Sequence, residues 1–333
     1  MSDYTIHVGD CLEGLRELPA GAARTCVTSP PYFGLRCYNG GDAEIGKEPT
    51  PDDFVAALVA VFREVKRVLR DDGTLWLNLG DSYAGAGYSN HQNTGGTQRT
   101  DGGKQKHMTG SGLKNKDLIG IPWRVAFALQ ADGWYLRQDI IWAKPNPMPE
   151  SVRDRCTKSH EYIFLLSKSP RYFFDAEAIL ESFADDRNGA SGAKSLPYSK
   201  GSGRNDTLSD GSRPGLGVSP IRSGRNRRSV WTVSTKPFKG AHFATFPPDL
   251  ILPCILAGCP KDGVVLDPFN GAGTTGLVSV QNNRNYIGIE LNAEYLEMAR
   301  ARIEAASPSE NNDFFVKKPT APTLFDFMLD ETK

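Results

Sequence analysis

Apolar and polar positions alternate along most of the chain in two different periods. Short apolar runs of the kind found in strands occupy residues 4–8, 74–79, 135–142 and 162–166. From residue 50 onward, apolar positions recur every three or four residues, which is typical of a helix with one buried face. Threonine, proline and an acid three residues after the threonine open that stretch, as at a capped helix start. Gly73 is expected to end the helix.

The same periodicities predict helices at 119–130 and from Asn292 to about Ala306. They predict two further strands, at 263–267 and 286–289. Strands that alternate with helices favour an α/β fold, doubly wound, with a mostly parallel Rossmann-like sheet and helices on both faces.

Composition narrows the class of protein. The 333 residues carry 39 Lys and Arg against 39 Asp and Glu, so any nucleic-acid binding must depend on local patches rather than on net charge. Six cysteines without a C-x-x-C pair fit a reducing cytoplasm and favour neither disulfides nor a metal site. No signal peptide and no run of membrane-spanning length is recognisable, so we expect an intracellular protein.

Ser29-Pro30-Pro31-Tyr32 follows a short apolar run and should lie where a buried strand leaves the sheet. Two successive prolines fix both φ angles and remove two N–H donors, so carbonyl acceptors face outward without a donor beside them. The hydroxyl before the prolines and the ring after them complete a pocket for a planar group with an exocyclic amine. A rigid turn with an incidental tyrosine is the alternative.

A second motif begins at the strand that ends in Asp267. The turn 268–276 follows, then a helical run, and then a strand that ends in Glu290. This order is that of a nucleoside-binding βαβ unit, in which glycines let the backbone approach the ligand and the final acid accepts the ribose hydroxyls. Gly271, Gly273 and Gly276 also match G-x-G-x-x-G, the fingerprint of nicotinamide dehydrogenases. The acid and proline that open the turn, its place late in the chain and the lack of a hydride-transfer site upstream argue against a dehydrogenase.

The run from Asp267 to Thr275 resembles the S-adenosylmethionine motif of the DNA amino-methyltransferases, and Ser29-Pro30-Pro31-Tyr32 resembles their catalytic tetrapeptide. The tetrapeptide comes first, as in the permuted (beta) class of that family. The resemblance covers roughly residues 4–180 and 229–305. It implies S-adenosyl-L-methionine as cofactor, with contacts from Asp10, His242, Phe243, Ala244, Asp267, Phe269, Asn270, Gly271, Gly273, Thr274, Thr275 and Glu290.

The resemblance also implies the reaction. The methyl group passes directly to an exocyclic amine of a base flipped out of double-stranded DNA. Ser29 Oγ and the Pro30 carbonyl would accept the amine hydrogens, and Tyr32 would stack on the base. A leading serine favours N4 of cytosine, with N6 of adenine as the alternative, and a cognate restriction endonuclease is an implied partner.

Other classes and roles stay open at this point. A methyltransferase acting on RNA or on a protein amide shares the proline-proline-aromatic logic, and a catalytically dead DNA-binding module would keep the fold. Pro253-Cys254 could mark a cytosine-C5 enzyme, but Cys254 lies in an apolar run and is expected in the core. Asp10 could equally cap a helix, and His242 could be an ordinary loop histidine.

Four segments are expected: a catalytic half (1–182), a basic insertion (183–228), a cofactor-binding half (229–306) and a tail (307–333). The loop 85–116 and the basic stretch 187–228 are too long and polar for ordinary connections, so they are either DNA-binding loops or solvated linkers. The candidates for DNA contact are Arg222, Arg225, Arg227 and Arg228. The apolar cluster 324–329 would either dock on the enzyme or bind a partner such as a sliding clamp.

Overall fold

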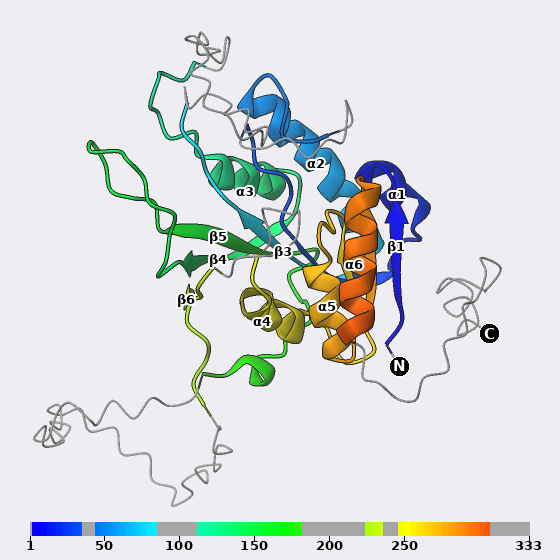
Figure 1. Ribbon diagram of the computed structural model, residues 1–333. Coiled ribbons are helices and arrows are strands. Elements are labelled where there is room, and N and C mark those ends of the chain that lie inside the picture. Colours follow the sequence, from blue (N-terminus) through cyan, green and yellow to red (C-terminus); the bar gives the residue numbers. More distant parts are fainter. Residues whose placement is uncertain (1, 35–43, 85–111, 182–223, 236–245, 307–333) are drawn as a thin grey trace, which may run out of the picture.

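The computed structural model describes residues 2–34, 44–84, 112–181, 224–235 and 246–306. Its centre is one eight-stranded sheet with the order β1-β8-β7-β2-β3-β5-β4-β6 (Figure 1). The strands are β1 (Tyr4–Val8), β2 (Ala23–Thr28), β3 (Leu69–Leu79), β4 (Tyr135–Ala143), β5 (His160–Ser167), β6 (Val230–Thr232), β7 (Val264–Asp267) and β8 (Asn285–Glu290).

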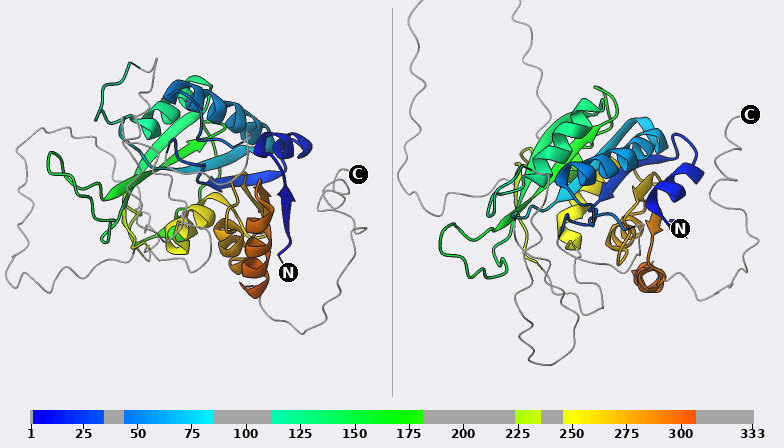
Figure 2. Two further views of the ribbon diagram at one scale, coloured as in Figure 1. Left: turned by 45° about the horizontal axis from the view of Figure 1, so that its top comes forward. Right: turned by 90° about the horizontal axis from the view of Figure 1, so that it is seen from above.

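Helices cover both faces of this sheet, as the views in Figure 2 show. One layer holds α1 (Cys11–Glu17), α2 (Pro51–Val68) and α3 (Ile121–Ala131), and the other holds α4 (Pro248–Gly258), α5 (Thr274–Gln281) and α6 (Ala293–Ala306). Each layer encloses its own apolar core against the sheet, so the expected doubly wound α/β fold is confirmed. Among the described helices, none combines the length and the apolar character needed to cross a bilayer.

The sheet is mostly parallel, as predicted. Strands β1, β8, β7, β2 and β3 run parallel, whereas β5 is antiparallel to both β3 and β4. The reversal of β5 places its beginning beside the end of β3, where Leu79 is opposite Tyr162. Residues that follow the parallel strands and residues that start β5 therefore meet at one edge of the sheet.

The helix predicted from residue 50 begins as expected but ends earlier. Thr50 caps it, since its Oγ1 accepts the Asp53 N–H at 3.1 Å. The helix stops at Val68, and Leu69 already has extended backbone angles, so the expectation that Gly73 ends it was wrong. Leu69 is opposite Ala23 and Thr74 opposite Thr25, so the residues between Leu69 and Thr74 form a bulge within β3.

The helix after the glycine turn begins at Thr274, two residues before Gly276. A Cβ on Gly276 would lie 2.5 Å from Ile303 of α6 and 2.7 Å from Tyr286 of β8. Gly276 therefore lets α5 pack closely on its neighbours. The match of Gly276 to the G-x-G-x-x-G spacing therefore reflects packing of this helix against β8 and α6.

Candidate active site

The two sequence motifs meet at the centre of the sheet, between β2 and β7. These neighbouring strands are far apart in sequence, and their helices, α2 and α5, lie on opposite faces. Ligands in open α/β sheets bind at such a switch point, beyond the carboxyl ends of the strands. The motifs are joined directly, because Thr28 Oγ1 donates a hydrogen bond of 2.6 Å to Asp267 Oδ1.

Asp267 is fully enclosed by hydrogen-bond donors from the protein. Besides Thr28, its Oδ1 accepts the Phe269 N–H at 3.0 Å, and its Oδ2 accepts Thr275 Oγ1 at 2.7 Å. Burial raises the pKa of Asp267 to about 6 despite these bonds. The carboxylate thus fixes the loop and the end of β2. A direct contact of this side chain with a cofactor, as the resemblance implies, has no support in this geometry.

Glu290 is in a different environment. Its two carboxylate oxygens accept backbone N–H groups, from Gly271 at 2.6 Å and from Asn292 at 2.9 Å. Burial raises the pKa of Glu290 to about 7. No cation pairs with this carboxylate in the described part of the chain, so each oxygen can still accept a hydroxyl donor from a ligand.

Asp10 lies at the end of the adjacent strand. Val8 is opposite Glu290 in the pairing of β1 with β8, and Gly9 donates its N–H to the Glu290 carbonyl at 2.9 Å. Asp10 Oδ1 caps α1 by accepting the N–H groups of Leu12 and Glu13. The expected capping role is confirmed. The expected cofactor contact stays a prediction that Oδ2 could fulfil.

The glycine loop between β7 and α5 is shaped by left-handed backbone at two glycines and by side-chain hydrogen bonds. Gly271 and Gly273 have φ angles of +51° and +72°, in the left-handed region that favours glycine. A Cβ on Gly273 would lie 2.7 Å from that of Ala299, so α6 packs directly on the loop. Asn270 secures the loop to β8, because its Oδ1 accepts the Tyr286 hydroxyl at 2.8 Å.

The two threonines after the loop have protein partners. Arg302 Nη1 of α6 donates to Thr274 Oγ1 at 3.2 Å, and Thr275 bonds to Asp267. Both threonine side chains are buried. Like Asp267, they shape the loop in this structure, and direct contact of their side chains with a cofactor is not supported. Phe269 is half-buried against the core.

The tetrapeptide projects from the end of β2 beside this loop. Within the described residues, neither the Ser29 hydroxyl nor the Pro30 carbonyl has a hydrogen-bond partner, so both remain available as acceptors. The Tyr32 hydroxyl donates toward Glu161 Oε2 at 2.7 Å and lies 3.2 Å from Asn78 Oδ1. The ring itself lies against Gly80.

These residues fit the cofactor that the resemblance implies. A nucleoside has ribose hydroxyls and a base amine, both hydrogen-bond donors, and Glu290 and Asp10 present carboxylates at the ends of two adjacent strands. Between them and the tetrapeptide lies the glycine loop, whose backbone can closely approach a ligand at Gly271. Asp10, Gly271 and Glu290 are thus the side chains and backbone that could hold S-adenosylmethionine.

Several predicted residues cannot be placed. His242, Phe243, Ala244 and Arg222 lie outside the described residues, as do most of the loop 85–116 and the whole tail. Lys116, at the end of the first loop, pairs with Asp154 at 2.7 Å.

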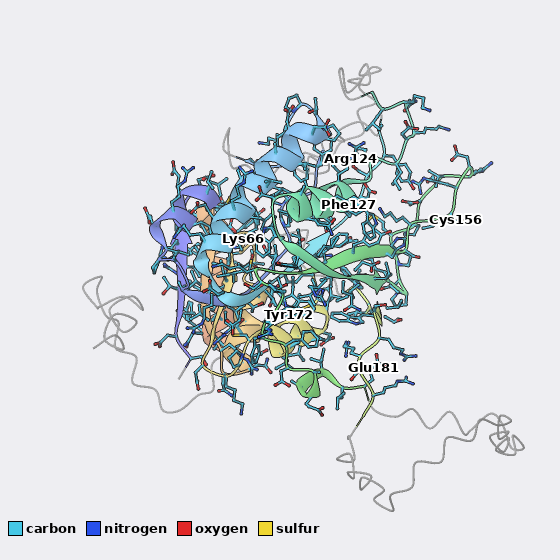
Figure 3. The ribbon with its side chains drawn as sticks, turned by 180° about the vertical axis from the view of Figure 1, so that it is seen from behind. Lys66, Arg124, Phe127, Cys156, Tyr172 and Glu181 are labelled. Carbon is cyan, nitrogen blue, oxygen red and sulfur yellow. The ribbon has the colours of Figure 1, made fainter. Side chains whose placement is uncertain are left out.

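The other basic residues do have positions. Arg225 and Arg228 pair with Glu181, at 3.2 and 2.9 Å, and the Arg227 guanidinium lies 4.7 Å from the centre of the Trp231 ring. Glu181 lies below β4 and β5 in Figure 3, where it is labelled. Both arginines that pair with Glu181 therefore contact the protein itself in this structure.

The sequence motifs assign no role to the residues that hold Tyr32. Asn78 is at the end of β3 and Gly80 directly follows that strand. Glu161 is at the start of β5, and Lys144 directly follows β4. The sequence does contain one indication of them: Lys144 and Glu161 are charged residues at the ends of two predominantly apolar segments. Cys254 is fully buried in α4, and burial raises the pKa of its thiol, so its expected place in the core is confirmed.

Comparisons with known proteins agree with this geometry. A family model described as DNA methylase matches residues 23–301. The chain is 49% identical over 304 residues to type II methyltransferase M.Cfr9I of Citrobacter freundii, covering 91% of this chain and 89% of that protein. It is 50% identical over 302 residues to type II methyltransferase M.XycI of Xanthomonas campestris pv. cyanopsidis, covering 90% and 87%. A solved PvuII DNA methyltransferase (cytosine-N4-specific) has a similar fold, with a TM-score of 0.60 and 18% identity, over 95% of this chain and 89% of that one.

Proposed function

The chain belongs to the DNA methylase family, and we propose that within it this enzyme methylates the exocyclic N4 of cytosine at a specific site in double-stranded DNA. Its S-adenosylmethionine dependence and its place among type II modification enzymes follow from that membership. A cognate restriction endonuclease is the proposed partner. The free cysteines of the described chain fit a cytoplasmic location.

One observation carries the proposal. The tetrapeptide and the glycine loop, 235 residues apart in sequence, are joined by the bond from Thr28 to Asp267. This contact supports the proposal that the methyl acceptor and the methyl donor bind side by side. The leading serine of the tetrapeptide supports cytosine over adenine, as does the specificity that names the PvuII enzyme.

In the proposed methyl transfer, each residue of the site has a separate role. Ser29 Oγ and the Pro30 carbonyl accept the hydrogens of the amine, which localises the nitrogen lone pair, and Tyr32 stacks on the flipped base. Glu290 and Asp10 orient the cofactor through its hydroxyl and amine donors. S-adenosylmethionine, when bound, supplies a methyl group activated by the neighbouring sulfonium charge. Catalysis then depends on alignment and on fixed dipoles, without a covalent intermediate.

DNA contact by Arg222, Arg225, Arg227 and Arg228 is part of the proposal. The described part of this cluster holds three guanidiniums and a single carboxylate partner, Glu181, so it has two positive charges in excess. This excess supports binding of phosphate groups even though two of the arginines already have a protein partner.

The test is the identity of the methylated base. DNA from cells that express the enzyme, and DNA treated with the purified enzyme and labelled cofactor, would be digested to nucleosides and analysed by mass spectrometry. We expect N4-methylcytosine, and a rate lowered about 10²–10³-fold in Ser29→Ala with cofactor affinity unchanged. If N6-methyladenine is the sole product, the cytosine assignment is wrong. If DNA stays unmodified while RNA or a protein amide is methylated, DNA is not the substrate of this chain.

A further inference from the structure

Tyr32 follows β2 and is held by residues of two other strands, β3 and β5. Its hydroxyl carries one proton and faces two acceptors, Glu161 Oε2 at 2.7 Å and Asn78 Oδ1 at 3.2 Å. The carboxylate is both closer and charged, so it takes the proton of this hydrogen bond. The position of the hydroxyl is thereby tied to the start of β5 and to the end of β3.

Each acceptor is itself held in place. Lys144 Nζ forms an ion pair with the other oxygen of Glu161 and lies 4.1 Å from the centre of the Trp142 ring. Asn78 Nδ2 donates to the Tyr162 carbonyl at 3.0 Å, which turns its Oδ1 toward Tyr32. The Lys144 and Glu161 side chains are only 17% and 16% exposed, so water screens this network weakly.

Gly80 lies in close contact with the Tyr32 ring. A Cβ at this position would lie 2.4 Å from Tyr32 Cε2 and 2.9 Å from Cδ2, both atoms of the ring. The φ angle of Gly80 is not in the left-handed region, so the backbone here would accept any residue. Glycine is thus needed for the space that the Tyr32 ring fills.

We infer that Glu161, supported by Lys144, is a positioning residue for methyl transfer, and that Gly80 completes the same support. Together they set the plane of Tyr32 against which the target base stacks. The inference rests on the proposed function, because it assumes that a flipped base contacts this ring.

A role in folding alone does not account for such a pair. An ion pair withdrawn from water costs about as much in desolvation as it gains, and apolar residues of similar size are often as stabilising. What the pair provides is one defined geometry for the hydroxyl it binds. Tyr32 belongs to the tetrapeptide, so that geometry is transmitted to the base pocket.

A double-mutant cycle tests the inference. Glu161→Gln and Tyr32→Phe each remove the charged hydrogen bond but keep side-chain shape and the stacking ring. We expect each to lower the single-turnover rate of methyl transfer roughly ten- to hundredfold at saturating cofactor, with cofactor affinity unchanged. The double variant should be no slower than the slower single variant, because both changes remove the same interaction. Independent, multiplying losses would show that Glu161 does not act through Tyr32.

A matched control separates this from a general effect of losing a carboxylate. Glu64 of α2 pairs with Arg67 at 2.7 Å and is 25% exposed. Arg67 in turn bonds to the carbonyls of Leu15 and Leu18, which precede β2, so this pair is remote from the carboxyl ends of the strands. Glu64→Gln should leave the transfer rate within about twofold, as surface pairs contribute little. If this variant is slowed as much as Glu161→Gln, the position of Glu161 has no special significance.

A second cycle needs no activity at all. Gly80→Ala should lower the melting temperature by several degrees in the wild-type background, because the new methyl group overlaps the Tyr32 ring. In a Tyr32→Ala background, where the ring is gone, the same change should have little effect. An equal decrease in melting temperature in both backgrounds would show that the Tyr32 ring does not contact Gly80. If the wild-type enzyme methylates no DNA, the proposed function fails, whereas this melting experiment still reports on the support of Tyr32.

Discussion

Two buried carboxylates at neighbouring strand ends differ in the donors that surround them. Hydroxyl groups and a backbone N–H from the protein occupy both oxygens of Asp267. Within the described residues, the donors to Glu290 are backbone N–H groups, those of Gly271 and Asn292 among them. The first carboxylate is therefore part of the scaffold, and the second retains acceptor capacity for a ligand.

We predict that cofactor binding depends on pH through Glu290. Ligand hydroxyls donate to the ionised carboxylate, so binding lowers a pKa that burial has raised to about 7, and affinity should increase as the pH rises through that value. At pH 7, binding should release on the order of half a proton. Calorimetry in two buffers of different ionisation enthalpy measures this release, which Glu290→Gln should abolish. Equal heats in both buffers would contradict the assignment.

The same raised pKa has a consequence for the free enzyme. Its folded form binds the proton of Glu290 more tightly than the unfolded chain, whose pKa lies near the ordinary value of 4.5. The stabilisation is therefore fully present below pH 4.5 and is lost as the pH rises through about 7. Denaturant titrations should show this decline in the wild-type enzyme and a smaller one in Glu290→Gln.

The contribution of the Thr28–Asp267 hydrogen bond to stability can be compared with that of the hydrogen bonds of Thr25, on the same strand. Thr28 and Thr25 are both buried in β2, but within the described residues Thr25 Oγ1 bonds only to uncharged groups of Thr74, its carbonyl at 3.1 Å and its hydroxyl at 2.9 Å. At pH 8 we predict that Thr28→Val lowers the free energy of unfolding by about 2–3 kcal/mol and Thr25→Val by about 1 kcal/mol, since hydrogen bonds to charged groups contribute more. Chemical denaturation gives both values. Similar losses in the two variants would mean that Asp267 is not ionised in the native enzyme.

At the scale of the element, sequence periodicity was sufficient for most helices and strands. The bounds of β4 and α6 differ from expectation by a single residue at one end. The end of α2 was missed because the helix stops at the buried residues Val68 and Leu69, where the chain must turn into the sheet, and no local signal marks that demand. The packing role of Gly276 has no local signal either, because it depends on Ile303 of α6 and Tyr286 of β8.

Packing of α6 on the glycine loop gives a prediction with an internal control. Gly273 and Gly21 have nearly the same φ, +72° and +74°, but only Gly273 faces another element, whereas nothing lies within 4 Å of a Cβ on Gly21. Gly21→Ala should cost about 1–3 kcal/mol for backbone strain alone. Gly273→Ala should cost about 1–3 kcal/mol more, through overlap with Ala299. Denaturation curves and cofactor titrations of both variants would test this, and equal costs would rule out a tight contact between the loop and α6.

The segment 224–228 yields a prediction about DNA affinity. Replacing Arg225, Arg227 and Arg228 by alanine should reduce the slope of log affinity against log salt by about one for each phosphate that the variant no longer neutralises. Arg63→Ala is the control, because this exposed arginine pairs with Asp132 on the face covered by α2 and α3. Filter binding over a range of salt measures both. An unchanged slope in the triple variant, with a lowered melting temperature, would show that these arginines stabilise the fold and do not contact DNA.

At the scale of the whole molecule, the sequence was sufficient to predict the fold and the cofactor. The residues that surround Tyr32 could not be predicted in the same way. The tetrapeptide and the glycine loop are contiguous in sequence, so their chemistry can be recognised locally. Tyr32, Lys144 and Glu161 come together only because β5 reverses direction and sits between β3 and β4. That order is a property of the assembled sheet, which no local pattern of apolar residues specifies.

The two halves of the chain share one sheet, since β2 pairs with β7 and β1 with β8. We predict that a fragment comprising residues 1–200 lacks a cooperative unfolding transition, because β2 would lose a neighbour at the centre of the sheet. Co-expression with residues 205–333 should restore both the transition and methyl transfer. Calorimetry of the separate and combined fragments measures this. A cooperative transition in the first fragment alone would show that it folds as an independent domain.

The position of β1 has a consequence for the timing of protein synthesis. Its partner in the sheet is β8, and the contact between Asp3 and Asn285 spans 282 residues. At a synthesis rate of about 5–20 residues per second, β1 leaves the ribosome roughly a quarter of a minute to a minute before its partner exists. During that interval Asp10 has no neighbouring Glu290, and the nascent chain has no place for the cofactor. Among the described strands β8 is translated last, so the cofactor site can form only after β8 has been synthesised.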